Sequence, residues 1–410
     1  MGVDVRSRVD GPRAELDPAR FFDDELPARL DEYAPAIVPS LAFVRPRPLV
    51  VEVGSDAWTL TADDRRVVIE RGARRDPTAH VRLGSEQLAD LADDQQTFMS
   101  LWASGALDQL AGNVGHLLDW WLVLRAALDG TPIYTPGSLS FDDREGRPLD
   151  LTHAFRPDDD RDEMRHFLET AGFLHIEGLF EPSEMHAISA DMDRAAPSYT
   201  EGDGRSWWAR TTDGETRLVR MQGFDRESDG ARALTDDTRF LALASIAGAG
   251  HRFGTKRANN RIEALFKPIG VTEGISDIPW HKDCGIGRHS YECCGLTVGI
   301  SVTGADATSG QLWVLAGSHR ALVWSGIRQP ELDLPEVPLP TRTGDVTLHL
   351  SCTMHMAQPP VERERRVMYS GFGLPALAST DADAVAAGRA RLGAVREGAP
   401  LTVLDRHFKS

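Results

Sequence analysis

The stretch GLTVGISV, residues 295–302, alternates between apolar side chains and small or hydroxylated ones. Successive side chains of an extended strand point to opposite faces, so this strand has two unlike faces. One face consists of four aliphatic residues, Leu296, Val298, Ile300 and Val302. The other face carries Thr297, Gly299 and Ser301. The stretch therefore predicts a β-strand with one apolar face and one polar face.

Further β-like runs lie on both sides of this strand, and long loops separate them. They occur in IEALFK, DIPWHKD, QLWVLAG, DVTLHL and RVMYSGFG. Residues 161–193 come before them and are typical of helix, strand, turn and helix. Short strands with helices only at the front favour a double-sheet jelly roll that carries a site inside. We expect this domain over residues 161–375, followed by a C-terminal tail over 376–410.

The N-terminal part of the chain predicts a separate, smaller α+β domain. Residues 48–72 contain three short β-rich runs separated by turn signals, and TAHVRL adds a fourth. Apolar residues then recur at helical spacing in NVGHLLDWWLVLRAAL, residues 113–128. We place this domain at residues 1–130. Residues 131–160 are rich in Pro, Gly and Asp, which indicates a linker.

The composition excludes several classes of function. With 410 residues, of which 41% are hydrophobic, the chain can form at least two cores of ordinary size. Its 62 acidic and 45 basic residues give a net charge of −17, which disfavours nucleic acid and anionic lipid as partners. No apolar run is long enough for a membrane span or a signal peptide. Four cysteines do not form a disulfide framework, so we expect a cytoplasmic protein.

The segment PWHKD contains a candidate pair of metal ligands. His281 and Asp283 are two residues apart on a predicted strand, so both can reach one ion while Lys282 points away. An imidazole and a carboxylate suit Fe(II) when a second histidine completes the triad. The spacing alone is weak, because the same pattern occurs at His175 and Glu177, which we expect to be structural.

A second candidate group lies in HLSCTMHMAQPPVERERRVMYSG, residues 349–371. Pro359 and Pro360 mark a turn between two β-like runs. If this turn closes an antiparallel hairpin, His355 and Arg366 face each other across it. A metal-bound 2-oxo acid can then bridge the two residues, since a guanidinium can bind its far carboxylate. His349 competes as the third ligand, but the same hairpin would place it opposite a phenylalanine, so we favour His355.

Together these segments make the region from about residue 161 to 375 similar to the phytanoyl-CoA dioxygenase family of Fe(II)/2-oxoglutarate-dependent oxygenases. PWHKD resembles the family's metal motif. SGQLWVLAGSHR, GDVTLHL, and His355 with Arg366 eleven residues later resemble its remaining segments. This implies a cupin-like jelly roll with Fe(II), 2-oxoglutarate and O2 as cofactors.

The resemblance also implies roles for individual residues. His281, Asp283 and His355 would be the iron ligands and catalytic residues, and Arg366 would anchor 2-oxoglutarate. Further candidates for the cosubstrate pocket are Lys267 and Thr297. Ala357 departs from the family, which often has a small hydroxylated residue there, so one hydrogen bond to the cosubstrate is in doubt. The presence of Asp283 argues against the halogenating relatives.

Residues 20–130, with DPTAHVRLGSEQLADLADDQQTFMSLWASGAL, resemble sterol-carrier-protein-type lipid-binding folds. The resemblance implies an apolar tunnel for acyl or sterol ligands, although an ordinary core explains the apolar stripe around Trp120 and Trp121 at least as well. Such a domain would deliver a hydrophobic substrate to the iron, or would serve for docking or dimerisation.

We expect an enzyme that hydroxylates a hydrophobic small molecule or acyl derivative, with release of succinate and CO2. One alternative is a non-catalytic lipid or acyl carrier whose second domain is inactive. Another is a related oxygenase that performs desaturation, cyclisation or epimerisation, because the outcome depends on where the substrate lies. The sequence leaves the substrate and the oligomeric state open.

Overall fold

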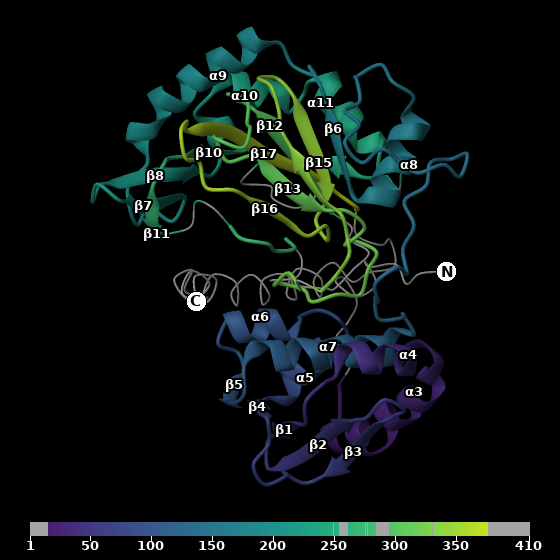
Figure 1. Cartoon of the computed structure of the whole chain (residues 1–410). Helices are drawn as coiled ribbons and strands as arrows, with labels where there is room; N and C mark the ends of the chain where they lie inside the picture. The colour runs from purple at the N-terminus through teal and green to yellow at the C-terminus, as the bar shows by residue number, and fades with distance from the viewer. Residues whose placement is uncertain are drawn as a thin grey trace.

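The computed structural model describes residues 15–248, 250–253, 261–274, 276, 278–283, 295–329 and 331–375. The predicted tail at 376–410 lies outside the described residues, as do Cys284, Cys293 and Cys294. The described chain forms an N-terminal α+β part and a C-terminal part built around a large antiparallel sheet (Figure 1). Among the described residues no helix is both long and apolar enough to cross a membrane.

The N-terminal part contains a 5-stranded sheet in the order β3-β2-β1-β4-β5. The first three strands form the meander that the sequence predicts, and β4 lies parallel to β1. Its strands are β1 (Leu49–Val53), β2 (Asp56–Ala62), β3 (Val67–Arg71), β4 (Ala79–Leu83) and β5 (Asp108–Ala111). Its helices are α2 (Pro18–Arg20), α3 (Leu26–Glu32), α4 (Ala34–Val44), α5 (Ser85–Ala92), α6 (Phe98–Ala103) and α7 (Val114–Asp129).

Helix α7 is the central helix of this part. Asn113 caps its start by accepting a hydrogen bond from the backbone of His116, and Gly130 ends it in the left-handed conformation at φ 68°. Trp120 and Trp121 are fully buried within the core between the helices and the sheet. Burial of such large apolar side chains supplies much of the driving force for folding.

The C-terminal part contains two facing sheets. A 9-stranded sheet runs in the order β11-β7-β8-β10-β17-β12-β15-β6, with β9 paired to β17, and a 3-stranded sheet runs β14-β13-β16. The strands of the large sheet are β6 (Phe173–Ile176), β7 (Ser206–Thr211), β8 (Thr216–Met221), β9 (Arg252–Phe253), β10 (Glu263–Lys267), β11 (Val271–Glu273), β12 (Gly295–Ser301), β15 (Val346–Leu350) and β17 (Arg365–Gly373). Those of the small sheet are β13 (Leu312–Leu315), β14 (Glu336–Leu339) and β16 (His355–Ala357). This arrangement is compatible with the expected jelly roll.

Helices cover the outer face of the large sheet (Figure 1). They are α8 (Arg161–Ala171), α9 (Pro182–Ala195), α10 (Asp229–Leu234) and α11 (Thr238–Ala242). The apolar face of β12 belongs to the same core as the buried side chains of α8 and α9. Its opposite face, with Gly299 and Ser301, lines a pocket between the sheets. The two faces of this strand thus separate the folding core from the interior of the barrel.

The predicted hairpin between His355 and Arg366 is wrong. Strand β16 pairs with β13, which places Val314 opposite His355. Strand β17 instead pairs with β10 and β12, which places Phe266 opposite Arg366. The chain crosses from the small sheet to the large one between β16 and β17. Residues at equal distances before and after the Pro359-Pro360 turn therefore do not pair with each other.

The barrel contributes one loop to the core of the N-terminal part. Leu322 belongs to that core and forms a parallel bridge with Ile133. The indole of Trp324 donates a hydrogen bond of 3.1 Å to Asp119 on α7. Burial raises the pKa of Asp119 to about 7, and nearby Glu331 adds to this while the indole opposes it.

This contact predicts a pH-dependent stability. The folded protein holds a proton on Asp119 that the unfolded chain releases near pH 3.8, so the contribution favours folding at low pH and is lost as the pH rises through about 7. Asp119→Asn keeps an acceptor for the indole without the buried charge. At pH 8 it should raise the free energy of unfolding by about 1–2 kcal/mol, allowing for partial solvent screening.

Chemical denaturation of both proteins at pH 8 and pH 4.5 measures this effect. The gain should shrink at the lower pH, where Asp119 is protonated. Asp108→Asn, which changes an exposed carboxylate on β5, is the matched control and should change little at either pH. A gain of the same size at both pH values would contradict the assigned protonation.

Candidate metal centre

The structure brings His281, Asp283 and His355 together at one end of the barrel. The backbones of His281 and His355 form an antiparallel bridge with two hydrogen bonds of 2.9 Å, so their side chains emerge next to each other. Their ring centroids are 4.2 Å apart. One potential ligand atom from each of the three residues lies within 4.8 Å of the other two.

One carboxylate oxygen faces both imidazoles. Asp283 Oδ1 is 3.6 Å from Nε2 of His281 and 3.7 Å from Nε2 of His355. Three donors on one side of a point, two nitrogens and one oxygen, make up the facial set that suits Fe(II) and leaves other coordination positions open. The donor set present therefore fits a divalent first-row metal.

Backbone carbonyls fix the orientation of both imidazoles. Nδ1 of His281 lies 2.7 Å from the oxygen of Pro279, and Nδ1 of His355 lies 2.9 Å from the oxygen of Thr353. A carbonyl oxygen can only accept, so each Nδ1 carries the proton and each Nε2 presents a lone pair. This arrangement is typical of metal-binding histidines.

The charge states of the group also suit a cation. For Asp283, burial alone would raise the pKa, but His355, His281 and His349 together hold it well below its usual range. Burial lowers the pKa of His355 well below its usual range, and the neighbouring His281 and His349 add to this. At neutral pH these residues therefore present an ionised carboxylate and a neutral imidazole, as metal binding requires.

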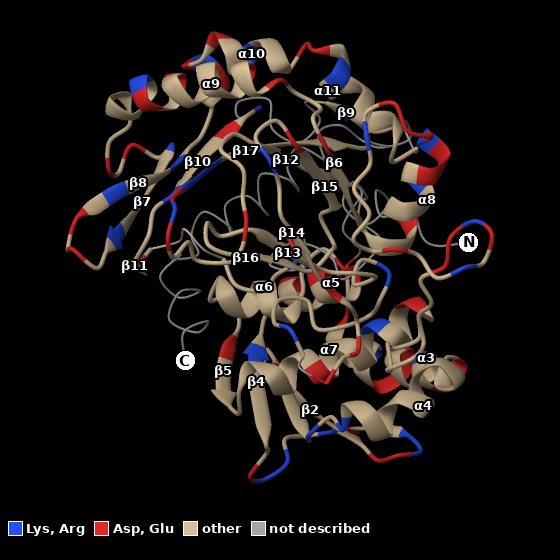
Figure 2. Ribbon diagram, turned by 45° about the horizontal axis from the view of Figure 1, so that its top comes forward, with Lys and Arg blue, Asp and Glu red and all other residues tan. Residues whose placement is uncertain are grey.

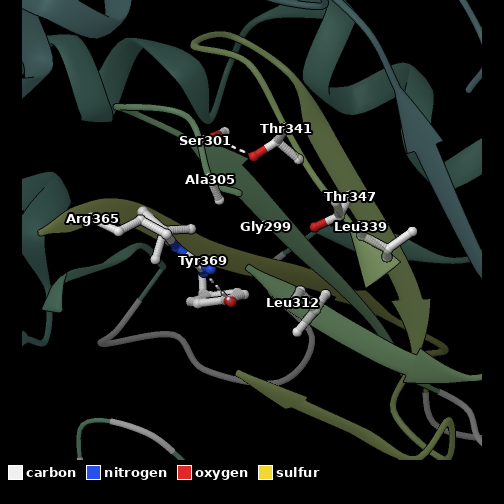
Figure 3. A pocket seen from close by; sticks show the side chains of 10 residues that line it. Gly299, Ser301, Ala305, Leu312, Leu339, Thr341, Thr347, Arg365 and Tyr369 are labelled. Atoms are coloured by element: carbon white, nitrogen blue, oxygen red, sulfur yellow. Dashed lines mark hydrogen bonds between the residues drawn. The ribbon is translucent and has the colours of Figure 1, made fainter. Parts of the chain in front are cut away.

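A pocket lies between the two sheets, beside the inner face of β12 (Figure 3). Thr297 contacts Asp283, and Gly299 and Ser301 follow on the same strand face. About 290 Å³ of space free of protein atoms lies at this pocket, part of it open to solvent. A Cβ atom at Gly299 would lie 2.8 Å from the hydroxyl oxygen of Thr347 and 3.1 Å from the ring of Tyr369, so only glycine leaves this space open.

Arg365 lies at this pocket, and Arg366 does not. Strand β17 alternates, so Arg365, Val367 and Tyr369 face the pocket while Arg366 faces α9. The guanidinium of Arg366 lies 2.7 Å from Asp193 and donates to the Ser189 carbonyl at 2.8 Å. The prediction that Arg366 anchors the cosubstrate is therefore corrected, because its side chain points out of the barrel.

The guanidinium of Arg365 is buried without a counter-charge. It is 4% exposed, and it donates to the carbonyl of Gly310 and, at 3.3 Å, to the hydroxyl of Tyr369. Across the described ranges no Asp or Glu carboxylate lies within ion-pair distance of it. Burial of an unpaired charge is costly, so this position calls for an anion. Strand alternation separates Arg365 from Arg366, but which of them faces inward is set by the pairing of β17 with β10 and β12.

The remaining predicted residues have other contacts. Lys267 lies opposite Arg365 on β10 and donates to the carbonyl of Ser276, and it is not among the residues that line the pocket. Thr297 donates to Asp283 Oδ2 at 3.1 Å, so it contacts a predicted ligand. His175 lies 3.0 Å from Asp345, consistent with a structural role.

The geometry predicts which histidines bind a divalent metal. His281→Ala and His355→Ala should each weaken the anaerobic binding of Co(II), followed by its visible absorption, by about 100-fold or more, beyond the ~10–100-fold typical of outer-shell changes. His319→Ala is the control, because that buried ring donates to the Glu169 carbonyl at 2.9 Å and lies outside the cluster. Normal binding by His355→Ala with loss in His349→Ala would contradict the choice of the third ligand.

Comparisons with known proteins place this centre in a family. Residues 168–367 match the family model described as phytanoyl-CoA dioxygenase (PhyH). A search of the curated proteins finds no match.

Several solved structures are similar to the chain. One is the non-heme alpha ketoglutarate dependent epimerase SnoN from nogalamycin biosynthesis, with a TM-score of 0.41 and 20% identity over 52% of this chain and 82% of that chain. A second is AviO1 from Streptomyces viridochromogenes Tue57, with a TM-score of 0.39 and 18% identity over 54% of this chain and 98% of that chain. A third is the non-heme alpha ketoglutarate dependent carbocyclase SnoK from nogalamycin biosynthesis, with a TM-score of 0.42 and 20% identity over 54% of this chain and 87% of that chain.

The family match contains the three clustered residues, and it also contains Arg365. Residues 168–367 of this chain are therefore a phytanoyl-CoA dioxygenase (PhyH) family domain.

Proposed function

We propose that the protein is an Fe(II)/2-oxoglutarate-dependent dioxygenase that hydroxylates a hydrophobic small molecule or acyl derivative. One observation carries this proposal: the inner face of β12 contacts a three-residue metal donor set through Thr297 and, further along, lines a pocket that has a buried, unpaired guanidinium in its wall. A 2-oxo diacid has the complementary groups, a chelating end and a distant carboxylate. The cofactors are Fe(II), 2-oxoglutarate and O2.

Each residue has a defined part in binding. His281, Asp283 and His355 would hold the iron. Arg365 would bind the far carboxylate of 2-oxoglutarate, because its guanidinium has more N–H donors than Gly310 and Tyr369 use. With these cofactors in place, oxidative decarboxylation to succinate and CO2 supplies the oxidising power for the substrate.

The pocket itself orients the cosubstrate and excludes water. The hydroxyls of Ser301 and Thr341 bond to each other at 2.8 Å, and with Thr347 they give the pocket polar walls (Figure 3). These groups can donate to a carboxylate, while the neighbouring aliphatic wall residues keep the site dry. In such a site the attraction between Arg365 and an anion is stronger than in water.

The reaction at the substrate has alternatives within the same chemistry. Desaturation, cyclisation and epimerisation also begin with hydrogen abstraction, and the placement of the substrate decides between them. The retained Asp283 carboxylate disfavours halogenation, which needs that position for halide. A non-catalytic carrier is disfavoured, because a carrier has no use for a metal donor set beside an unpaired buried arginine.

For the N-terminal part, the likeness to sterol carriers stays a prediction. Its pocket is lined by apolar side chains, among them Phe21, Leu88 and Trp121, around about 360 Å³ of space free of protein atoms. The contact between Trp324 and α7 favours a role of the N-terminal part in docking and supporting the barrel. We also propose a cytoplasmic location, because the four cysteines of the chain do not make a disulfide framework.

The proposed function predicts a spectroscopic and a catalytic result. Anaerobic addition of Fe(II) and 2-oxoglutarate should give the metal-to-ligand charge-transfer band of the chelate, and oxygen should then release succinate. Arg365→Gln should weaken 2-oxoglutarate binding by about 10–150-fold, the equivalent of a hydrogen bond to a charged group. Arg366→Gln is the matched control, because its side chain faces Asp193.

Three results would contradict the proposal in different ways. Absence of the charge-transfer band in the wild-type protein would contradict the proposal that it binds Fe(II) and 2-oxoglutarate. Loss of 2-oxoglutarate binding in Arg366→Gln with normal binding in Arg365→Gln would reverse the anchor assignment. Succinate release without any oxidised product in a screen of hydrophobic compounds and acyl derivatives would contradict the substrate class.

A further inference from the structure

A third histidine lies beside the candidate metal centre without an assigned role. His349 is on β15, is 1% exposed, and its ring centroid is 4.3 Å from that of His355. In the part of the chain that the structure describes, neither of its ring nitrogens has a hydrogen-bond partner. A buried polar group without a partner destabilises the folded protein, so its presence here calls for an explanation.

The polar atom that His349 faces belongs to Asp283. Nε2 of His349 is 3.6 Å from Asp283 Oδ2. The same oxygen accepts a hydrogen bond of 3.1 Å from Thr297, which lies directly opposite His349 on the neighbouring strand. Two adjacent strands thus place a hydroxyl donor and an imidazole nitrogen beside one carboxylate oxygen, although the imidazole is beyond hydrogen-bond distance.

The two oxygens of Asp283 consequently have different surroundings. Oδ1 faces the Nε2 atoms of His281 and His355, where an ion bound by the three residues would lie. Oδ2 faces Thr297 and His349 instead. A carboxylate whose second oxygen is held in this way can offer only one oxygen to a metal.

We propose that His349 is a positioning residue that, together with Thr297, keeps Asp283 a one-oxygen ligand. This inference rests on the proposed Fe(II) site. An octahedral ion with three protein ligands has room for a bidentate 2-oxo acid and for O2. A second Asp283 oxygen on the metal would occupy one of these positions, so His349 preserves the open site through Asp283.

The other role considered for His349 is that of a fourth ligand. The described residues whose ligand atoms all lie within 4.8 Å of one another are His281, Asp283 and His355, and His349 is not in this group. A direct ligand and a positioning residue differ in what a substitution does. Glutamine retains an N–H donor but is a poor metal ligand, whereas leucine retains neither property.

The experiment compares His349→Gln and His349→Leu with the wild-type protein. Under anaerobic conditions, Co(II) affinity is measured by visible absorption, and 2-oxoglutarate affinity is measured from the charge-transfer band of the Fe(II) complex. His349→Leu should weaken metal binding by about 10–100-fold, as loss of an outer-shell partner does. It should also weaken 2-oxoglutarate binding at saturating iron, because the freed Asp283 oxygen competes for a coordination position. His349→Gln should restore both affinities towards wild type.

Two further variants separate positioning from packing. Thr297→Val removes the hydroxyl that donates to Asp283 Oδ2 and should change the metal and 2-oxoglutarate affinities in the same direction as His349→Leu. His319→Leu removes a different buried histidine and should lower the thermal stability of the metal-free protein without altering the 2-oxoglutarate band of the iron complex.

The outcomes are distinguishable. Wild-type metal and 2-oxoglutarate affinities in His349→Leu would overturn the inference. Loss of metal by His349→Gln as complete as in His355→Ala would also overturn it, because His349 would then be a ligand. Failure of the wild-type protein to bind Fe(II) and 2-oxoglutarate would instead overturn the proposed function on which the inference rests.

Discussion

The two backbone hydrogen bonds between His281 and His355 are the constraint on which the candidate site depends. They join a loop that precedes β12 to the start of β16, and they set the two imidazoles side by side. Each ring is then fixed by a carbonyl two residues before it in the chain, at Pro279 and Thr353. The site is therefore formed by main-chain geometry, which places the side chains before any ion binds and lowers the cost of binding.

The two-faced strands explain how one sheet can serve both stability and chemistry. The outer face of β12 is buried under α8 and α9 with the apolar core, so its inner face need not contribute to that core. The inner face can then carry Thr297, Gly299 and Ser301, which would weaken an apolar core. The same division holds on β17, where Met368 and Phe372 belong to the core while Arg365 and Tyr369 face the pocket.

Sequence reasoning selected the three residues that cluster in the structure, but it did not select the arginine that faces the pocket, and the reason is geometric. The spacing of His281 and Asp283 predicted a shared strand face. The structure instead has a loop there, with an isolated bridge at His281, but the two side chains still lie together with His355. The choice between Arg365 and Arg366 depends on which face of β17 is inside, and that is set by pairing with β10 and β12. A shift of one residue moves a side chain to the opposite face, so an error in the assumed pairing exchanges the two arginines. The meander of β1, β2 and β3 was predictable because its strands pair with their neighbours in the chain. Strand β5 was not predicted from the sequence, because α5 and α6 separate it from its partner β4.

The net negative charge of the chain means that its surface does not draw an anionic cosubstrate towards the site. Binding of such an anion would depend on short-range contacts with the buried Arg365. The chain carries a net charge of −17, and basic and acidic residues alternate along α9 and the β7–β8 hairpin in Figure 2. Arg194 forms an ion pair with Asp191 on α9, and Arg217 forms one with Asp213 in the hairpin. A surface of this kind does not attract a dianion over long distances, and salt screens exposed charges beyond about 8 Å. Binding of a diacid must then come from short-range contacts inside the barrel, where Arg365 is desolvated and unpaired among the described residues. In the function that we propose, the anion would therefore be selected by contacts within the pocket and not by the charge of the surface.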